Sequence, residues 1–537
     1  MSQPDLIVVG GGVNGLVAAT LLARSGRKTL VVERSDRVGG CARTSEIAPG
    51  FRGPTLAHAA SIDPELVRSL ALERHGLTII RPAIDACAPA LDGDGLLLWH
   101  DIERACQQIR SRSERDAAQY RRFLDSFARI SGVLRTVFAA PPPDIDAARA
   151  ADVVALLKTG RRFRALGKTD AYRLLRWITL PAGDLVREWF EAEPLRATIA
   201  AGGVLGSFLG PASAGSGAVL LLLGAGHGRP VGGDWFVKGG PGALADSLAA
   251  AARAAGVDIR TSVDVARIDV DGERATGVTT AAGDVFEARA VVSAVDPKHT
   301  LLRLVDPLHL APETIRRVQN IRTRGTLAKV NYAVSALPRF SSLASMDARE
   351  QGAALSGRVR LAAGLDTIER AFDAAKYGGF SDEPWIELTI PSVLDPDLAP
   401  RGQHVISAYV QYAPYCLRGT TWEAERGRLA AAATRTIGRY APGFEASILA
   451  HEVVTPLDLE RKYGLTGGHI FHGELALDQF FVTRPTLGMA RYATPIANLF
   501  LCGSGTHPGV GLTGRAGANA AKAIAGALTR QAAPRGR

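Results

Sequence analysis

A glycine-rich turn between two apolar segments near the N-terminus constrains the fold of this chain more than any other feature. Residues 5–9 form an apolar run with a polar first residue, which predicts a buried strand. Gly10, Gly12 and Gly15 follow directly in the spacing G-x-G-x-x-G. Gly10 permits the tight turn, Gly12 lets a pyrophosphate approach the backbone, and Gly15 lets the next helix pack on the strand.

The segments after this turn complete a strand–helix–strand unit. Residues 16–24 are rich in Ala and Leu and predict a helix, and residues 28–32 predict a second strand. Glu33 stands at the tip of that strand, where a carboxylate can accept hydrogen bonds from both hydroxyls of an adenosine ribose. The helix N-terminus offers free N–H groups and a partial positive charge to the pyrophosphate. The N-terminal segment therefore predicts a dinucleotide site.

The residues after the second strand distinguish FAD from NAD. Residues 37–44, with the sequence RVGGCART, place the doublet Gly39–Gly40 directly behind that strand. This segment resembles the R-x-G-G-R-x-x-S/T pattern of the FAD superfamily that contains amine oxidases, phytoene desaturases and Rab GDP-dissociation inhibitors. In that superfamily the doublet lets the backbone fold close over the flavin side of the cofactor. Cys41 stands where the pattern has Arg.

A second glycine-rich loop lies near the C-terminus. Residues 499–502 predict a strand, residues 503–514 form the loop GSGTHPGVGLTG, and residues 515–528 predict a helix. The segment repeats the strand–loop–helix arrangement that binds anions at a helix N-terminus. In the FAD superfamily the matching loop contacts the ribityl-pyrophosphate, and the helix points its N-terminus at the flavin N1–C2=O edge.

With both loops in place, nearly the whole chain resembles the phytoene-desaturase-related flavoproteins, in the branch called pyridine nucleotide-disulfide oxidoreductase domain-containing proteins. The segments PSVLDP at 391–396 and YGLTGGHIFHGE at 463–474 carry the resemblance between the loops. It implies an α/β fold, with a discontinuous Rossmann-like FAD-binding domain of the glutathione-reductase type and a mixed-sheet substrate domain with covering helices. The implied FAD-binding domain takes residues 1–75, 232–300 and 455–530, the substrate domain takes 76–231 and 301–454, and 531–537 form a flexible tail.

The same resemblance assigns the residues that hold noncovalently bound FAD. Val265 falls at the adenine, and residues 55–58 fall beside the isoalloxazine ring, where His58 is interpreted as a packed histidine rather than a catalytic one. The assigned residues lie in the loops or at the strand ends: Gly10, Gly12, Val13, Asn14, Gly15, Glu33, Arg34, Gly39, Gly40, Cys41, Ala42, Thr55, Leu56, Val265, Gly503, Gly511, Leu512 and Thr513.

The resemblance implies a phytoene desaturase-like, FAD-dependent oxidoreductase of the dehydrogenase or desaturase type. It would transfer a hydride between a largely apolar small molecule and flavin N5. Two alternatives stay open: an amine oxidase or double-bond isomerase, and a binding protein without turnover like the Rab GDP-dissociation inhibitors. Because the flavin carries the chemistry, a catalytic side chain is not required, and His472 and Glu474 are the candidates for an assisting base. No second G-x-G-x-x-G follows a strand, so we expect oxygen, a quinone or a redox protein as electron acceptor.

Histidines and cysteines give no sign of a metal or a dithiol centre. His469 and His472 form an H-x-x-H pattern beside Glu474, but the flanking glycines favour a loop, and a zinc site needs three or four converging ligands. The 5 cysteines are widely spaced without C-x-x-C, which predicts reduced thiols. The first strand begins at residue 5, which leaves no room for a targeting peptide and predicts a cytoplasmic protein.

Charge and polarity suggest two surfaces. The net charge is 63 − 53 = +10, but the arginines are dispersed, so we expect no nucleic-acid partner. The densest basic segment, 158–168, is interpreted either as a solvated helix face or as a contact with an anionic membrane. The oligomeric state stays open.

Residues 197–228 contain no Asp, Glu, Lys or Arg, although glycines and Pro211 interrupt any helix that would span a membrane. We expect this uncharged stretch to be buried, either as ordinary core or as the wall of an apolar cavity. In the second case the glycine-rich part at 207–217 would leave space for the ligand.

Overall fold

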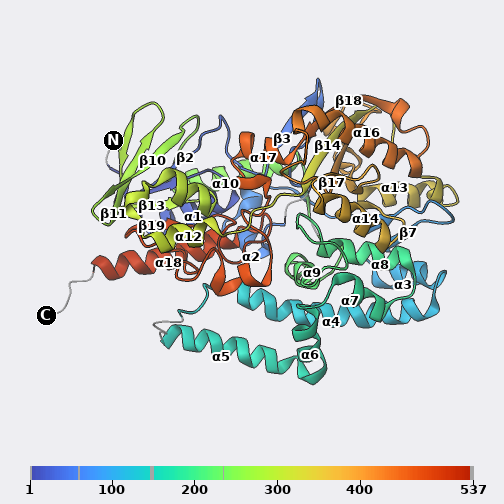
Figure 1. Cartoon of the computed structure of the whole chain (residues 1–537), viewed down its shortest axis with the longest axis horizontal. Helices are drawn as coiled ribbons and strands as arrows, with labels where there is room; N and C mark the ends of the chain where they lie inside the picture. The colour runs from blue at the N-terminus through green and yellow to red at the C-terminus, as the bar shows by residue number, and fades with distance from the viewer. Residues whose placement is uncertain (1–2, 59–60, 145–149, 234, 533–537) are drawn as a thin grey trace.

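Two β-sheets of different connectivity organise the chain (Figure 1). The computed structural model describes residues 3–58, 61–144, 150–233 and 235–532. The first sheet has 5 parallel strands in the order β19-β13-β1-β2-β9. In chain order these strands are β1 (Leu6–Val9), β2 (Thr29–Val32), β9 (Asp258–Arg260), β13 (Ala290–Ser293) and β19 (Leu499–Leu501).

Helices and a small sheet cover both faces of the parallel sheet, which explains why its strands read as uninterrupted apolar runs. Leu6 and Val8 on β1 face α1 (Val13–Arg24) and α18 (Arg515–Ala532). Ile7 and Val9 face the opposite way, toward an antiparallel sheet of three strands. The strands of that small sheet are β10 (Val265–Asp271), β11 (Arg274–Thr280) and β12 (Val285–Glu287).

The second large sheet has 7 strands in the order β18-β14-β17-β16-β15-β6-β7. Its neighbouring strands run antiparallel except for the parallel pair β15 and β6. The strands are β6 (Ile84–Ala88), β7 (Leu96–Trp99), β14 (Leu327–Val334), β15 (Arg358–Leu361), β16 (Trp385–Thr389), β17 (His404–Gln411) and β18 (Ile448–Val454).

Helices surround this second sheet, and one pair projects below the body of the molecule (Figure 1). The projecting pair is α5 (Ala150–Ala165) and α6 (Gly167–Trp177). The helices nearer the sheet are α3 (Ile102–Arg110), α4 (Glu114–Phe138), α7 (Ala182–Trp189), α8 (Glu193–Ala200), α9 (Ser216–Ala225), α13 (Ala348–Ser356), α14 (Leu365–Lys376) and α16 (Trp422–Tyr440). Further elements are α2 (Pro64–Ser69), β3 (Thr44–Ala48), β4 (Phe51–Pro54), α10 (Pro241–Ala254), α12 (Pro312–Gln319) and α17 (Pro456–Tyr463).

The α/β fold class is confirmed, with a Rossmann-like parallel sheet beside a mixed sheet and its helices. The strands of the parallel sheet lie within the three ranges expected for the FAD-binding domain, and those of the mixed sheet lie within the two ranges expected for the substrate domain. The tail expected at 531–537 begins too early, because α18 continues to Ala532; residues 533–537 lie outside the described part of the chain. Within the described residues, every helix falls short of the length or apolarity that crossing a bilayer requires.

The contact between α1 and α18 generates a prediction about stability. A Cβ added at Gly517 on α18 would overlap the backbone carbonyl of Asn14 on α1, whereas one at Gly526 would meet only the flexible end of Arg530, at 3.3 Å. We expect Gly517→Ala to lower the free energy of unfolding by about 1–3 kcal/mol, because the helices must separate. Gly526→Ala is the matched control and should be neutral or slightly stabilising, since Ala favours a helix interior. Denaturant unfolding of both variants measures the difference, and equal stabilities would contradict the tight contact.

Candidate functional site

A cavity of about 640 Å³ is lined from both large sheets. We call the part lined by the two glycine-rich loops and the segments around the parallel sheet the nucleotide half. We call the part lined by α4, α9 with its following loop, and the seven-stranded sheet the distal half. A cavity of this size lies within the range of ordinary ligand sites.

Glycines bring two loops together at the edge of the parallel sheet. Gly10 has a φ of +99°, which the tight turn at the end of β1 requires. Gly12 pairs with Gly39 in an isolated β-bridge, and a Cβ at Gly40 would lie 3.2 Å from the Cα of Gly12. The α1 helix begins behind this contact with Gly12 as its N-cap and without a side-chain cap. Its first N–H groups therefore face the cavity with a partial positive charge, as an anion site requires.

Glu33 is fixed in place by backbone donors. Its Oε2 accepts a hydrogen bond of 2.8 Å from the N–H of Gly11, and its Oε1 accepts one of 2.9 Å from the N–H of Ser35. The carboxylate lines the cavity beside Arg34. Because each carboxylate oxygen has a second lone pair, Glu33 retains acceptor capacity for ribose hydroxyls.

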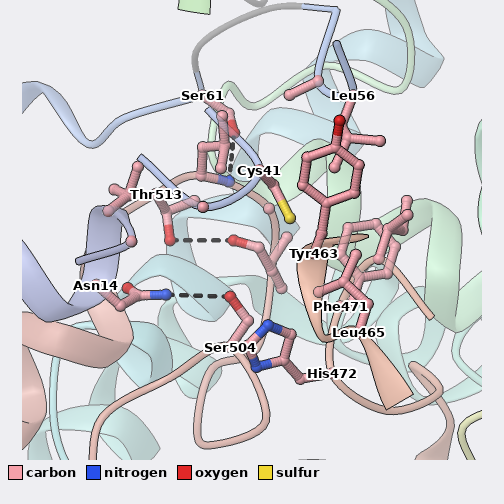
Figure 2. Close-up of a pocket in the computed structure, with 18 of the residues that line it drawn as sticks. Asn14, Cys41, Leu56, Ser61, Tyr463, Leu465, Phe471, His472, Ser504 and Thr513 are labelled. Carbon is pink, nitrogen blue, oxygen red and sulfur yellow. Dashed lines mark hydrogen bonds between the residues drawn. The ribbon is translucent and has the colours of Figure 1, made fainter. Parts of the chain in front are cut away.

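Asn14 joins the N-terminal and C-terminal loops (Figure 2). Its side-chain amide donates to Ser504 Oγ at 3.0 Å, and its Oδ1 accepts from the backbone N–H of Gly517 at 3.2 Å. Ser61 in turn accepts from the backbone N–H of Leu512 at 3.2 Å. The N-termini of α1 and α18 are thus held side by side at the same cavity, and together with Glu33 they fit the phosphates and ribose of a dinucleotide.

Most of the residues assigned to FAD from the sequence line this cavity: Gly10, Gly12, Val13, Asn14, Gly15, Glu33, Arg34, Gly39, Gly40, Cys41, Leu56, Val265, Gly511, Leu512 and Thr513. Three do not, and these positions are corrected. Ala42 is buried in the core against α10, Thr55 is tied to Ser45 by a 2.7 Å hydrogen bond, and Gly503 packs against the backbone of Ala294.

The structure separates the two candidates for an assisting base. His472 lines the cavity near Ser504 (Figure 2), and burial lowers the pKa of its imidazole. Glu474 lies behind the wall in ion pairs with Arg322 Nε at 2.9 Å and Arg324 Nε at 3.0 Å. Glu474 is therefore a loop anchor and is corrected as a candidate base, because it does not line the cavity, whereas His472 does.

A row of polar side chains crosses the seven-stranded sheet under the cavity. Lys329 on β14 pairs in register with Tyr409 on β17, Tyr409 with Glu387 on β16, and Glu387 with Arg360 on β15. Residues in register share one face of a sheet, so the four side chains form a continuous line. Lys329, Tyr409 and Arg360 line the cavity, and Glu387 lies beneath them. Sequence reasoning missed this row; its one local signal is a lysine inside the apolar strand 327–334.

The charges of this row are strongly shifted by burial. Burial lowers the pKa of Lys329 well below its ordinary value, and its Nζ donates a 2.8 Å hydrogen bond to the carbonyl of Pro54. Burial alone would raise the pKa of Glu387, but Arg358 and Arg360 overcome it and hold that pKa below its usual range. The ionised form of Glu387 is therefore stabilised, and Lys329 loses its proton more readily than an exposed lysine does.

His58 lies over this row. Its ring stacks on Tyr409 with centroids 3.6 Å apart, and its Nδ1 lies 3.9 Å from Glu387 Oε1. Both ring nitrogens are buried without a hydrogen-bond partner in the described residues. Burial first, and then Lys329 and Arg358, lower the pKa of His58 well below its usual value. A neutral imidazole that lines the cavity without partners can bond to a ligand.

The uncharged stretch 197–228 lines the cavity at its two ends rather than in its middle. Gly202 and Leu205 contribute before the loop, and Leu222 to Gly224 contribute from α9. The expectation that residues 207–217 leave space for the ligand is wrong, because this segment packs against the chain beside β17: the hydroxyl of Tyr412, which follows β17, donates to the carbonyl of Leu209 at 2.7 Å. Among the described residues, no group of three or more His, Cys, Asp or Glu side chains is arranged to hold a metal.

Comparison with known proteins places the chain among flavoproteins. Residues 100–525 match the family of flavin-containing amine oxidoreductases, and residues 8–71 match an NAD(P)-binding Rossmann-like domain. A rat protein called pyridine nucleotide-disulfide oxidoreductase domain-containing protein 2 is 37% identical, over 97% of this chain and 93% of its own. A lycopene-forming phytoene desaturase from Paracoccus is 26% identical, over 97% and 96%. The fold is similar to a putrescine oxidase variant at 17% identity and a TM-score of 0.60, over 98% and 99%.

The geometry of Glu33 generates a prediction about cofactor affinity. We expect Glu33→Ala to weaken FAD binding about ten- to hundredfold, because two ribose hydroxyls lose their acceptor. Exposed Glu273 offers a control substitution, Glu273→Ala, that should leave affinity unchanged. FAD occupancy after dialysis, read from flavin absorbance, measures the effect. Full retention by Glu33→Ala would show that the adenosine lies elsewhere.

Proposed function

Because the chain belongs to the family of flavin-containing amine oxidoreductases and is an FAD-dependent oxidoreductase, we propose that it acts on a largely apolar small molecule by hydride transfer, like a phytoene desaturase. The observation that supports the proposal is the position of the distal half. Leu205, Leu222 and Leu327 form apolar walls that continue from the nucleotide half. These walls exclude water, which hydride transfer requires.

Different residues of this chain would bind the cofactor and accept the proton. The glycine-rich loops and Glu33 would hold FAD, whose flavin accepts or supplies the hydride when bound. Removing a hydride from one carbon to form a double bond also releases a proton from the neighbouring carbon. Lys329 stands where this proton can be received: it bonds to Pro54, two residues before Leu56, and lines the distal half. Its neutral amine would take the proton at Nζ and become an ammonium, with Tyr409 beside it.

Both glycine-rich loops lie at the same edge of one parallel sheet, and Asn14 joins them, so they serve a single dinucleotide. For reoxidation of the flavin we therefore propose oxygen, a quinone or a redox protein rather than a nicotinamide held by a second glycine-rich turn.

A peripheral contact with an anionic membrane is the second part of the proposal. On α5, Val153, Val154, Leu156 and Leu157 are 46%, 49%, 49% and 68% exposed, in a helix that projects from the body (Figure 1). The basic side chains of the same helical pair are also exposed: Lys158, Arg161, Arg162, Arg164 and Lys168. A projecting helix with exposed apolar residues and neighbouring cations suits a lipid surface of negative charge.

The position of α5 connects this surface to the cavity. Arg162 on α5 donates a hydrogen bond to Thr136 on α4, between Arg135 and Phe138, which line the distal half. An apolar substrate dissolved in the membrane would thus reach the cavity along a short path. This supports a membrane contact over an ordinary solvated face.

The protonation state of Lys329 generates a prediction about rate. We expect Lys329→Met to retain FAD but to slow substrate-dependent flavin bleaching about hundredfold or more, because the proton acceptor is lost. In the wild type, bleaching should fall as the pH drops through the pKa of Lys329, since only the neutral amine accepts a proton. Because burial lowers that pKa, activity should persist well below the ordinary pKa of lysine.

The measurement is anaerobic stopped-flow absorbance with an apolar alkene or cyclic ketone that reduces the wild type. Lys329→Arg, which stays charged, should be as slow as Lys329→Met. A Lys329→Met enzyme with the wild-type rate and pH profile would remove Lys329 from the mechanism.

The exposed face of α5 generates a prediction about lipid binding. We expect the protein to sediment with phosphatidylcholine vesicles that contain phosphatidylglycerol. Leu157→Asp should lower this partition about tenfold, because a leucine that would insert into the lipid is replaced by a carboxylate of the same sign as the lipid surface. Leu308, which is 91% exposed on another surface, supplies the matched control Leu308→Asp. Equal loss in both variants, or no binding by the wild type, would contradict the contact.

A further inference from the structure

The charged residues along the cavity are divided unevenly between its halves. Carboxylates that line the cavity, Glu33, Asp63 and Asp264, all stand in the nucleotide half. Within the described residues, no carboxylate lines the distal half. The cations there are Arg135, Arg229, Lys329, Arg358 and Arg360.

Among the described residues, two carboxylates behind the wall pair with these cations. Asp85 accepts from Arg229 Nη1 at 2.6 Å, and Glu387 accepts from both Arg358 and Arg360. The described charged side chains that line this half are therefore cations, and they would attract an anionic group on a ligand.

Arg360 is the cation best placed to hold an anion. Its Nε donates to Glu387 Oε2 at 2.8 Å and its Nη1 donates to the carbonyl of Thr198, so the guanidinium is fixed. Its Nη2 has no partner among the described residues, although the side chain lines the cavity and is only 5% exposed. A rigid guanidinium with free donors matches the geometry of a carboxylate.

Arg135 marks the outer end of the same half. Its side chain is exposed, and its Nη1 donates to the carbonyl of Ala225 at 3.2 Å, at the end of α9. No ion pair joins it to a carboxylate in the described part of the chain. An exposed cation at the mouth of a cavity attracts an anionic ligand toward it.

We propose that the substrate carries a carboxylate on its apolar body, that Arg360 holds this carboxylate in the distal half, and that Arg135 attracts it at the mouth. This inference rests on the proposed function and narrows its substrate class. It also separates this chain from oxidation of protonated amines, since an ammonium group would enter a half that, among the described residues, is lined by cations and by no carboxylate. The carboxylate anchors the substrate, and the carbon that loses the hydride lies on the apolar body.

The test measures binding to the oxidised, FAD-loaded protein by isothermal titration calorimetry, so that turnover is not needed. The probes are decanoate, 1-decanol and decylamine, which share one chain length and differ in charge. We expect decanoate to bind at least about tenfold more tightly than 1-decanol, and decylamine to bind most weakly, because a charge-assisted hydrogen bond is worth about that factor. Decylamine binding as tightly as decanoate would overturn the proposal.

Two variants locate the site. Arg360→Gln should weaken decanoate about ten- to hundredfold and leave 1-decanol unchanged. Arg360→Gln removes a partner of buried Glu387 and can therefore fail to fold. The second variant is Arg135→Gln, at an exposed position. It should weaken the binding of decanoate but not of 1-decanol, and it should reduce the salt dependence of decanoate binding. Exposed Arg401 lies outside the cavity wall and gives the control Arg401→Gln. Full decanoate preference in folded Arg135→Gln, or in folded Arg360→Gln, would overturn the assignment of that residue.

The failure of this inference and the failure of the proposed function give different results. If the protein binds decanoate preferentially but no apolar substrate reduces its flavin, the carboxylate site is supported and the proposed reaction is contradicted. If neutral apolar molecules reduce the flavin and decanoate is not bound preferentially, the proposed reaction is supported and the carboxylate site is contradicted.

Discussion

The close contact between α1 and α18 is the interaction on which the rest of the structure depends. Helix α18 approaches α1 so closely that only glycine fits at position 517, and Asn14 bonds to both Ser504 and the Gly517 backbone. This contact brings the first and last glycine-rich loops of the chain to one edge of one sheet. Two helix N-termini, each a weak anion site alone, then act on the same dinucleotide. The nucleotide half therefore exists only when both ends of the chain are folded together.

The second sheet contributes a different kind of surface. Its buried strands accept a lysine, a glutamate and an arginine in one row, which is unfavourable unless each group finds a partner or changes protonation. Glu387 finds two guanidiniums, whereas Lys329 is left with a backbone carbonyl and a lowered pKa. Burying these groups lowers the stability of the fold, but it also lowers the pKa of the lysine. A neutral amine in a dry cavity can receive a proton. Apolar walls and buried cations together define a substrate with two distinct ends.

Much of the nucleotide half could be predicted from the sequence, because its determinants are contiguous. The turn from Gly10 to Gly15 needs small residues at fixed spacing, and Glu33 follows one helix and one strand later. The strands of the second sheet could also be recognised, as at 327–334 and 404–411, since each is a continuous apolar run. The ligand space expected at 207–217 failed, because glycine content reports small side chains and not the direction in which a loop faces.

The sequence by itself determined the cofactor loops, the strand and helix segments, and the class of chemistry that they serve. Only the tertiary structure decided which polar residues meet at the distal half. Lys329, Glu387, Arg360 and Tyr409 are separated along the chain and become a row through the register of four strands. Register depends on the pairing of whole strands, and a shift of one residue would turn every side chain to the other face. A local pattern holds no information about that pairing, whereas a glycine turn is constrained by its own backbone.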